Sequence, residues 1–164
     1  MDENSRQAAA KLSILLRTLG IEAEIIDHSH QGGKTSENAS SALGEPLERV
    51  LKCLLFVPRE KDLGRPVIGV IVGGHQRVDV KKLEKISSVR NLRLATAREV
   101  LAITGYQVGG VPPVVLSSIC TTYIDLEVMS QPYVVGSAGT EFIGMKVNPQ
   151  EFLKAGFLLA DISK

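Results

Sequence analysis

Apolar residues recur at helical spacing near the start of the chain, and the pattern then becomes strand-like. Between Ser5 and Leu19 they lie three or four positions apart, at Ala8, Leu12, Leu15, Leu16 and Leu19. This spacing places them on one face of a helix, and Gly20 supplies a helix stop. The isoleucine-rich segment 21–27 alternates weakly, which is typical of a strand.

Two continuous apolar runs predict strands that are buried on both faces. The first run is 52–57 (KCLLFV), with a lysine at its entrance, and the second is 67–72. Apolar residues at every position over strand length are typical of interior strands, because both faces must pack against other elements. The polar segment 59–66 between the two runs predicts a loop.

Capping residues predict the shorter helices. We expect helices over 35–43, 46–51, 80–87, 96–105 and 148–156, each of which pairs a capping or first-turn residue with a stop. Thr96 and Glu99 have the spacing of a capping box. Short apolar or β-branched runs predict further strands over 92–94, 114–116, 133–135, 142–147 and 157–162, and one or two strands over 120–128.

The order of these elements indicates a fold class. Helices and strands are interspersed, but several neighbouring strands have connections too short for a parallel crossover. We therefore expect an α+β fold, with one compact domain over residues 1–164. It would contain a mixed, mainly antiparallel and barrel-like β-sheet with surrounding helices.

Composition narrows the class of protein. Apolar residues make up 44% and aromatic residues 4%, so the core is aliphatic. The formal net charge is +1, which by itself predicts neither attraction to nucleic acid nor repulsion from it. A basic cluster at Lys81, Lys82 and Lys85 is either a solvated face or a surface that meets a phosphate backbone.

The cysteines and the beginning of the chain indicate a cellular compartment. Cys53 and Cys120 lie in apolar runs, which favours buried free thiols over a disulfide. The beginning is polar and then helical, without the apolar core of a signal peptide, and no apolar run approaches the roughly 18 residues of a membrane span. We expect a cytoplasmic protein that has no membrane partner.

Three segments are candidates for ligand binding. Segment 104–113 (TGYQVGGVPP) combines glycines, which permit close backbone approach, with prolines, which fix φ. Considered alone, the segment is a turn. If it lies beside a pocket, it would present rigid N–H donors to a ligand. Lys52 either extends into solvent or donates from the rim of a pocket to a phosphate, hydroxyl or carbonyl. Segment 136–139 (GSAG) follows a strand but lacks the Gly-x-Ser-x-Gly spacing of a nucleophile elbow.

The histidines give a weaker signal. His28 and His30 lie two positions apart and would point the same way on an extended segment. Without a third ligand we expect no metal site, and a polar or ligand contact is favoured. No motif of a Walker loop, a dinucleotide fingerprint or a zinc ribbon occurs, so no cofactor is expected.

Together these segments resemble the YbaK/prolyl-tRNA synthetase-associated domain family. The resemblance covers nearly the whole chain, and its motifs occur in the right order. The residues that show it are Lys52 in VLKCL, 77–83 (RVDVKKL), 104–113 and 136–139. It implies a mixed sheet with helices. It also implies the activity of many members, which deacylate mischarged tRNA, notably tRNA for proline that carries cysteine or alanine.

The resemblance also implies roles for residues. Lys52 would bind the 3′-terminal adenosine or the aminoacyl ester. Gly109 and Gly110 would offer backbone groups to the substrate, and Gly136 and Ser137 would line the opposite side. An aminoacyl ester is already activated, so positioning a water and stabilising the developing oxyanion suffice.

Three departures from the family pattern leave the specificity open. Pro112 replaces the family serine in the substrate-facing loop, and His28 and His30 occupy a Tyr-x-His pattern. Thr140 and Glu141 stand where basic residues are common. We expect a trans-acting deacylase whose partners are the aminoacylated 3′ end of tRNA and, as a second candidate, a tRNA synthetase. The alternatives are a non-catalytic module that binds a tRNA acceptor end or a synthetase, and a small-molecule binder.

Overall fold

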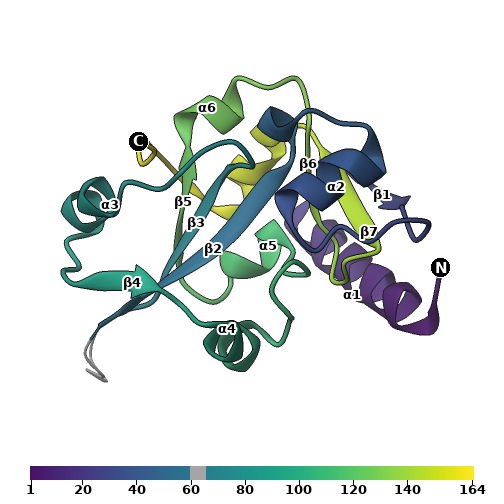
Figure 1. Ribbon diagram of the computed structural model, residues 1–164, viewed down its shortest axis with the longest axis horizontal. Coiled ribbons are helices and arrows are strands. Elements are labelled where there is room, and N and C mark those ends of the chain that lie inside the picture. Colours follow the sequence, from purple (N-terminus) through teal and green to yellow (C-terminus); the bar gives the residue numbers. More distant parts are fainter. Residues whose placement is uncertain (60–65) are drawn as a thin grey trace.

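Two β-sheets surrounded by helices form the core of the protein (Figure 1). The computed structural model describes residues 1–59 and 66–164. Most of the loop expected over 59–66 therefore lies outside the described residues. The two sheets contain three and five strands.

The larger sheet has the strand order β4-β2-β3-β5-β8. These strands are β2 (Leu51–Pro58), β3 (Ile68–Gly73), β4 (Leu92–Leu94), β5 (Thr121–Asp125) and β8 (Leu158–Ala160). β2 runs antiparallel to β3 and β4, whereas β3 and β8 run parallel to β5. Every residue of β3 is buried, which explains its uninterrupted apolar sequence.

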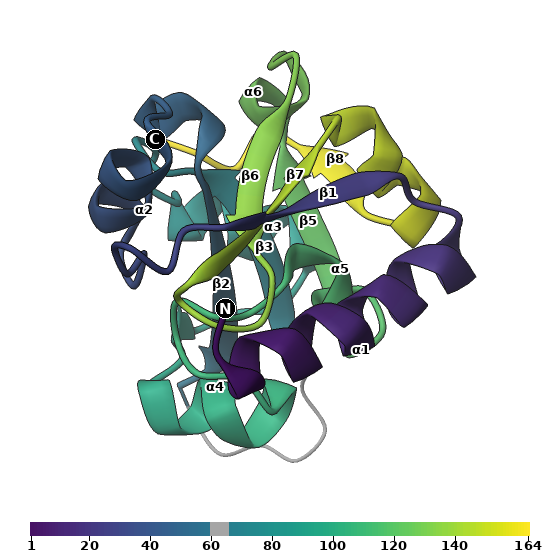
Figure 2. The same ribbon diagram turned by 90° about the vertical axis from the view of Figure 1, so that its right-hand side faces the viewer.

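The smaller sheet is antiparallel and has the order β1-β7-β6. Its strands are β1 (Ala23–Asp27), β6 (Val134–Ser137) and β7 (Ile143–Val147). Helix α1 (Glu3–Leu19) lies alongside it (Figure 2) and buries Leu12 and Leu16 in the same apolar cluster as Met145 of β7. The helical spacing near the start of the chain is thereby explained.

The two sheets meet at the entrance of β2. An isolated parallel bridge joins Val50 to Val135 of β6. Within residues 1–59 and 66–164 this contact does not extend into a ladder, so the sheets do not close into a barrel. The expected α+β fold with mixed, mainly antiparallel pairing is confirmed.

The remaining helices begin largely where their caps predict. They are α2 (Ser36–Leu43), η1 (Leu47–Arg49), α3 (Val80–Ser87), α4 (Ala97–Thr104), α5 (Pro113–Leu116), α6 (Leu126–Met129) and η2 (Pro149–Ala155). Both halves of the Thr96–Glu99 capping box form. The Thr35 side chain accepts the Asn38 N–H at 3.1 Å, as expected for an N-cap.

Several expectations were wrong in detail. The strand expected over 114–116 is helix α5, because Pro113 has a φ suited to a first helical turn and no N–H for a ladder. Segment 120–128 contains one strand and then α6, which begins where the Asp125 side chain accepts the Glu127 N–H. The last helix, η2, has 3₁₀ rather than α geometry. β6 extends through Ser137, so Gly136 and Ser137 end a strand rather than follow one.

The aromatic pair in the apolar cluster shared with β7 provides a test of the core. Phe152 is fully buried, and its ring centroid lies 5.4 Å from that of Phe157. Phe152→Ala should lower the free energy of unfolding by about 3–5 kcal/mol, because it leaves a cavity. The matched control is Leu153→Ala, at a side chain that is 46% exposed, and should change it by no more than about 0.5 kcal/mol. Urea unfolding followed by circular dichroism measures both, and equal losses would contradict this packing.

Candidate functional site

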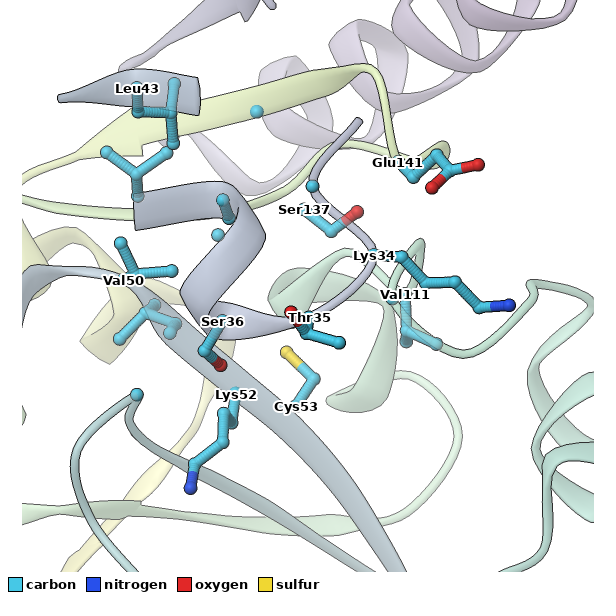
Figure 3. Close-up of a pocket in the computed structure, with 18 of the residues that line it drawn as sticks. Lys34, Thr35, Ser36, Leu43, Val50, Lys52, Cys53, Val111, Ser137 and Glu141 are labelled. Atoms are coloured by element: carbon cyan, nitrogen blue, oxygen red, sulfur yellow. The ribbon is translucent and has the colours of Figure 1, made fainter. Parts of the chain in front are cut away.

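A cavity of about 330 Å³ lies where the two sheets meet (Figure 3). Its lining comes from the first half of β2, segment 33–37 at the start of α2, loop 108–111, and the end of β6 with the residues up to 144. These segments are far apart in the sequence. The fold thus gathers these four segments, together with His28, Leu43 and Gly74, around one space.

The floor of the cavity is an open edge of β2. On the side away from β3, β4 pairs with β2 only from Phe56 to Pro58, and no other described strand forms a ladder with residues 51–55. The Leu55 carbonyl faces this side, because it accepts the Ala95 N–H at 2.8 Å. Residues two apart in a strand direct their backbone groups to the same edge, so the N–H and C=O of Cys53 also face the cavity.

Lys52 lines this cavity, but its ammonium is directed elsewhere. Nζ donates a hydrogen bond to the backbone carbonyl of Gln76, and in Figure 3 it points away from Ser137. Burial lowers the pKa of Lys52; the nearby Glu37 carboxylate opposes this shift and Arg77 adds to it. The sequence left open whether this ammonium extends into solvent or lies at the rim of a pocket; in the structure the side chain lines the cavity and its ammonium is held by a backbone carbonyl.

The carbonyl that receives Lys52 belongs to a fixed turn. The Gln76 side chain is buried, accepts the Gly73 N–H at 2.8 Å, and donates to the carboxylate of Asp125 at 2.7 Å and that of Glu127 at 3.0 Å. Asp125 in turn accepts the N–H of Ile162 at 3.1 Å. This network fixes the position of the Lys52 side chain from outside the cavity.

Two glycines allow the walls to approach one another. Gly109 has φ +86°, and a Cβ there would lie 2.5 Å from the Lys34 carbonyl oxygen. A Cβ on Gly136 would lie 2.6 Å from Cγ of Pro113. Any side chain at either position would therefore push the loops apart.

The structure gathers only some of the residues singled out from the sequence. Those in the cavity lining are His28, Lys52, Gly109, Gly136 and Ser137. Gly110 lines a neighbouring hollow, and Pro112 precedes α5 as its buried N-cap. The ring of His30 lies 3.2 Å from the Ala42 carbonyl through Nε2, outside the lining. His28 and His30 thus do not act as a pair.

His28 and Ser137 present defined polar atoms. Nδ1 of His28 lies 3.1 Å from the Gln31 carbonyl. A carbonyl only accepts, so Nδ1 carries the proton and Nε2 of the neutral ring is an acceptor. The Ser137 hydroxyl donates to the Thr140 carbonyl at 3.4 Å.

Cys53 is a lining residue that the sequence did not single out as a site. Burial raises the pKa of its thiol to about 12, so it is protonated at neutral pH and is a poor nucleophile. Thr35, Glu37 and Glu141 also line the cavity. Thr35 was recognised only as a helix cap, and no sequence pattern links segments 35–37 and 141 to β2.

The described part of the chain contains no group of three or more His, Cys, Asp or Glu side chains that could hold a metal ion. None of the helices in residues 1–59 and 66–164 combines the length and apolar character needed to cross a bilayer.

Several known proteins with similar sequences have names that refer to tRNA. The model of the aminoacyl-tRNA editing domain matches residues 30–155. A protein of Enterococcus faecalis, provisionally named Cys-tRNA(Pro)/Cys-tRNA(Cys) deacylase EbsC, is 29% identical over 119 residues, which are 73% of this chain and 70% of that protein. A proline–tRNA ligase of Nitratidesulfovibrio vulgaris is 34% identical over 107 residues, which are 65% of this chain and 18% of the ligase.

Solved structures agree with this relationship. A hypothetical protein superposes with a TM-score of 0.83 at 28% identity, covering 94% of this chain and 99% of that chain. A protein provisionally described as a trans-editing enzyme for prolyl tRNA synthetase superposes with a TM-score of 0.78 at 27% identity, covering 96% and 97%. The chain therefore belongs to the aminoacyl-tRNA editing domain family.

Proposed function

We propose that this protein hydrolyses the ester of mischarged aminoacyl-tRNA in trans, and that its substrate is tRNA for proline carrying cysteine or alanine. The observation that carries the proposal is the cavity where the β2 edge meets the Gly109 and Gly136 segments. Family membership supports the reaction class. The name of the Enterococcus relative, a deacylase of Cys-tRNA(Pro), supports the choice of tRNA.

The size and lining of the cavity suit the end of an aminoacylated tRNA. About 330 Å³ is at the small end of the range for ligand sites. Leu51, Val135 and Ile143 provide an apolar surface for a short amino-acid side chain. Open backbone groups of β2 and the Nε2 acceptor of His28 are available to the polar parts of the ligand. One methylene more or less in a pocket of this kind changes binding by only about 1–3 kcal/mol, so a small side chain would be selected by the lack of room for a larger one.

The chemistry we propose uses a water molecule rather than a protein nucleophile. Cys53 is a protonated thiol, and the Ser137 hydroxyl donates to a carbonyl instead of to a base. Water would attack the ester carbonyl, and backbone N–H groups near Gly109 would stabilise the developing oxyanion. The Ser137 hydroxyl would join them by turning away from the Thr140 carbonyl. The bond between the carbonyl carbon and the ribose oxygen would then break, with a proton of the water passing to that oxygen, which would leave a free amino acid and a tRNA hydroxyl. Lys52 would leave the Gln76 carbonyl through its rotatable stem and add a positive charge next to the ester or the 3′ adenosine.

The role of Lys52 is tested by substitution. Lys52→Ala should lower kcat/KM for release of cysteine or alanine from mischarged tRNA by about 100-fold or more, because the charge that stabilises the transition state is lost. Lys164→Ala, at an exposed lysine outside the cavity lining and outside the basic cluster of α3, is the matched control and should keep full activity. Release of radiolabelled amino acid measures both. A wild-type protein that binds mischarged tRNA but leaves the lifetime of cysteinyl, alanyl, seryl and threonyl esters unchanged would instead be a non-catalytic binding module.

The protonated state of Cys53 gives a pH-dependent test. With a pKa of about 12, only about one thiol in ten thousand is ionised at pH 8, and reactivity should increase as the pH rises toward that value. Native protein treated with iodoacetamide at pH 8 should therefore retain its hydrolytic activity, and Cys53 should be labelled only after unfolding. Rapid inactivation that follows labelling of Cys53 would contradict the water mechanism. Mass spectrometry of the labelled peptide identifies the site.

A further inference from the structure

A second hollow of about 220 Å³ adjoins the main cavity. The two share part of their lining, at Lys34, Val108, Thr140 and Glu141. The second hollow therefore begins where the first opens. A ligand that fills the main cavity can continue into it.

The chemistry of this lining fits an unstacked nucleobase. Phe142 is partly exposed and offers an aromatic ring. The hollow is also lined by the carboxylates of Asp2 and Glu141 and by the carboxamides of Asn4 and Gln107. Proteins recognise single-stranded ends by stacking bases on aromatic rings and by hydrogen bonds to base edges. A carboxylate accepts a hydrogen bond from an exocyclic amine such as cytosine N4, and a carboxamide both donates and accepts.

Lys34 lies at the boundary between the two hollows. It is exposed, and in Figure 3 its ammonium points away from Cys53, on the side of the cavity where Glu141 lies. No ion pair joins it to any residue in the described ranges 1–59 and 66–164. A phosphodiester that links two nucleosides, one in each hollow, would pass this ammonium and be neutralised by it.

Hydrogen bonds fix the walls of the second hollow. The Ser5 and Thr140 hydroxyls lie 2.7 Å apart and tie the start of α1 to the segment after β6. Asp2 accepts the Ser5 N–H at 2.7 Å, and Gln107 accepts the Gly110 N–H at 2.9 Å through its carbonyl. The Gln107 side chain itself is exposed and free to meet a ligand. A preformed site of this kind binds without a large ordering cost.

We propose that the second hollow is a subsite for the base of the nucleotide that precedes the terminal adenosine. At the 3′ end of tRNA that nucleotide is a cytidine, whose N4 amine would meet a carboxylate while its ring stacks on Phe142. The assignment of the nucleotide rests on the proposed function. The subsite would give this domain affinity for tRNA beyond that for a single aminoacylated nucleoside.

Binding of unacylated fragments to the full chain tests the subsite without hydrolysis. Dissociation constants are measured by NMR titration for adenosine and for the dinucleotides CpA and UpA. CpA should bind about tenfold or more tightly than adenosine, because one base gains a stacking partner. UpA should lose part of this gain, since uracil has the size of cytosine but places its O4 acceptor where cytosine places an amine.

Substitutions separate the subsite from the main cavity. Phe142→Leu and Gln107→Ala should each reduce the preference for CpA and leave the affinity for adenosine unchanged. Gln150→Ala, at an exposed glutamine of η2, is the matched control and should keep the full preference.

The outcomes distinguish this subsite from the proposed function. Equal affinities for adenosine and CpA, equal affinities for CpA and UpA, or no binding of CpA at all would overturn the subsite, even if the protein hydrolyses mischarged tRNA. A preference for CpA that is lost in Phe142→Leu supports the subsite, even if no ester is hydrolysed and the proposed reaction fails.

Discussion

The open edge of β2 is the constraint on which the site depends. β2 meets β6 only through the bridge between Val50 and Val135, and it meets β4 only from Phe56 onward. Between these points, in the described part of the chain, no strand pairs with this edge, and the Cys53 backbone faces the cavity. The cavity therefore follows from the way the two sheets join, and its floor is suited to a polar ligand.

The walls of the cavity leave no room for a side chain at Gly109 or Gly136. Gly109 packs on the Lys34 carbonyl, and Gly136 packs on the ring of Pro113, so each wall fixes the next. On the opposite side, the Gln76 network fixes the turn whose carbonyl receives the Lys52 ammonium, while the lysine stem itself stays rotatable. Catalysis by positioning and electrostatics requires such rigidity, because donors act only where the reacting atoms are held. The same glycines that suggested a turn in the sequence thus serve to bring distant loops together.

Local chemistry could be predicted from the sequence, but its placement in space could not. Features that depend on residues close together in the sequence were predicted correctly. They are the Thr96–Glu99 capping box, the buried strand β3 and the α+β class. The strand expected over 114–116 was wrong, because Pro113 favours a first helical turn even though the residues after it are apolar. The cavity lining was found only in part, since Glu141 and segment 35–37 reach β2 through tertiary packing that no spacing encodes.

The distribution of charge around the two hollows indicates which parts of a tRNA are recognised. Asp2, Glu37 and Glu141 bring negative charge to the linings, and Lys34 is the cation at their boundary. A protein that binds mainly through phosphates neutralises many of them and carries a basic face. Here the net charge is +1, and the carboxylates would repel any phosphate not placed at Lys34. Recognition at this site must therefore depend on the ester, the adenosine and the base edge rather than on the charge of the RNA backbone.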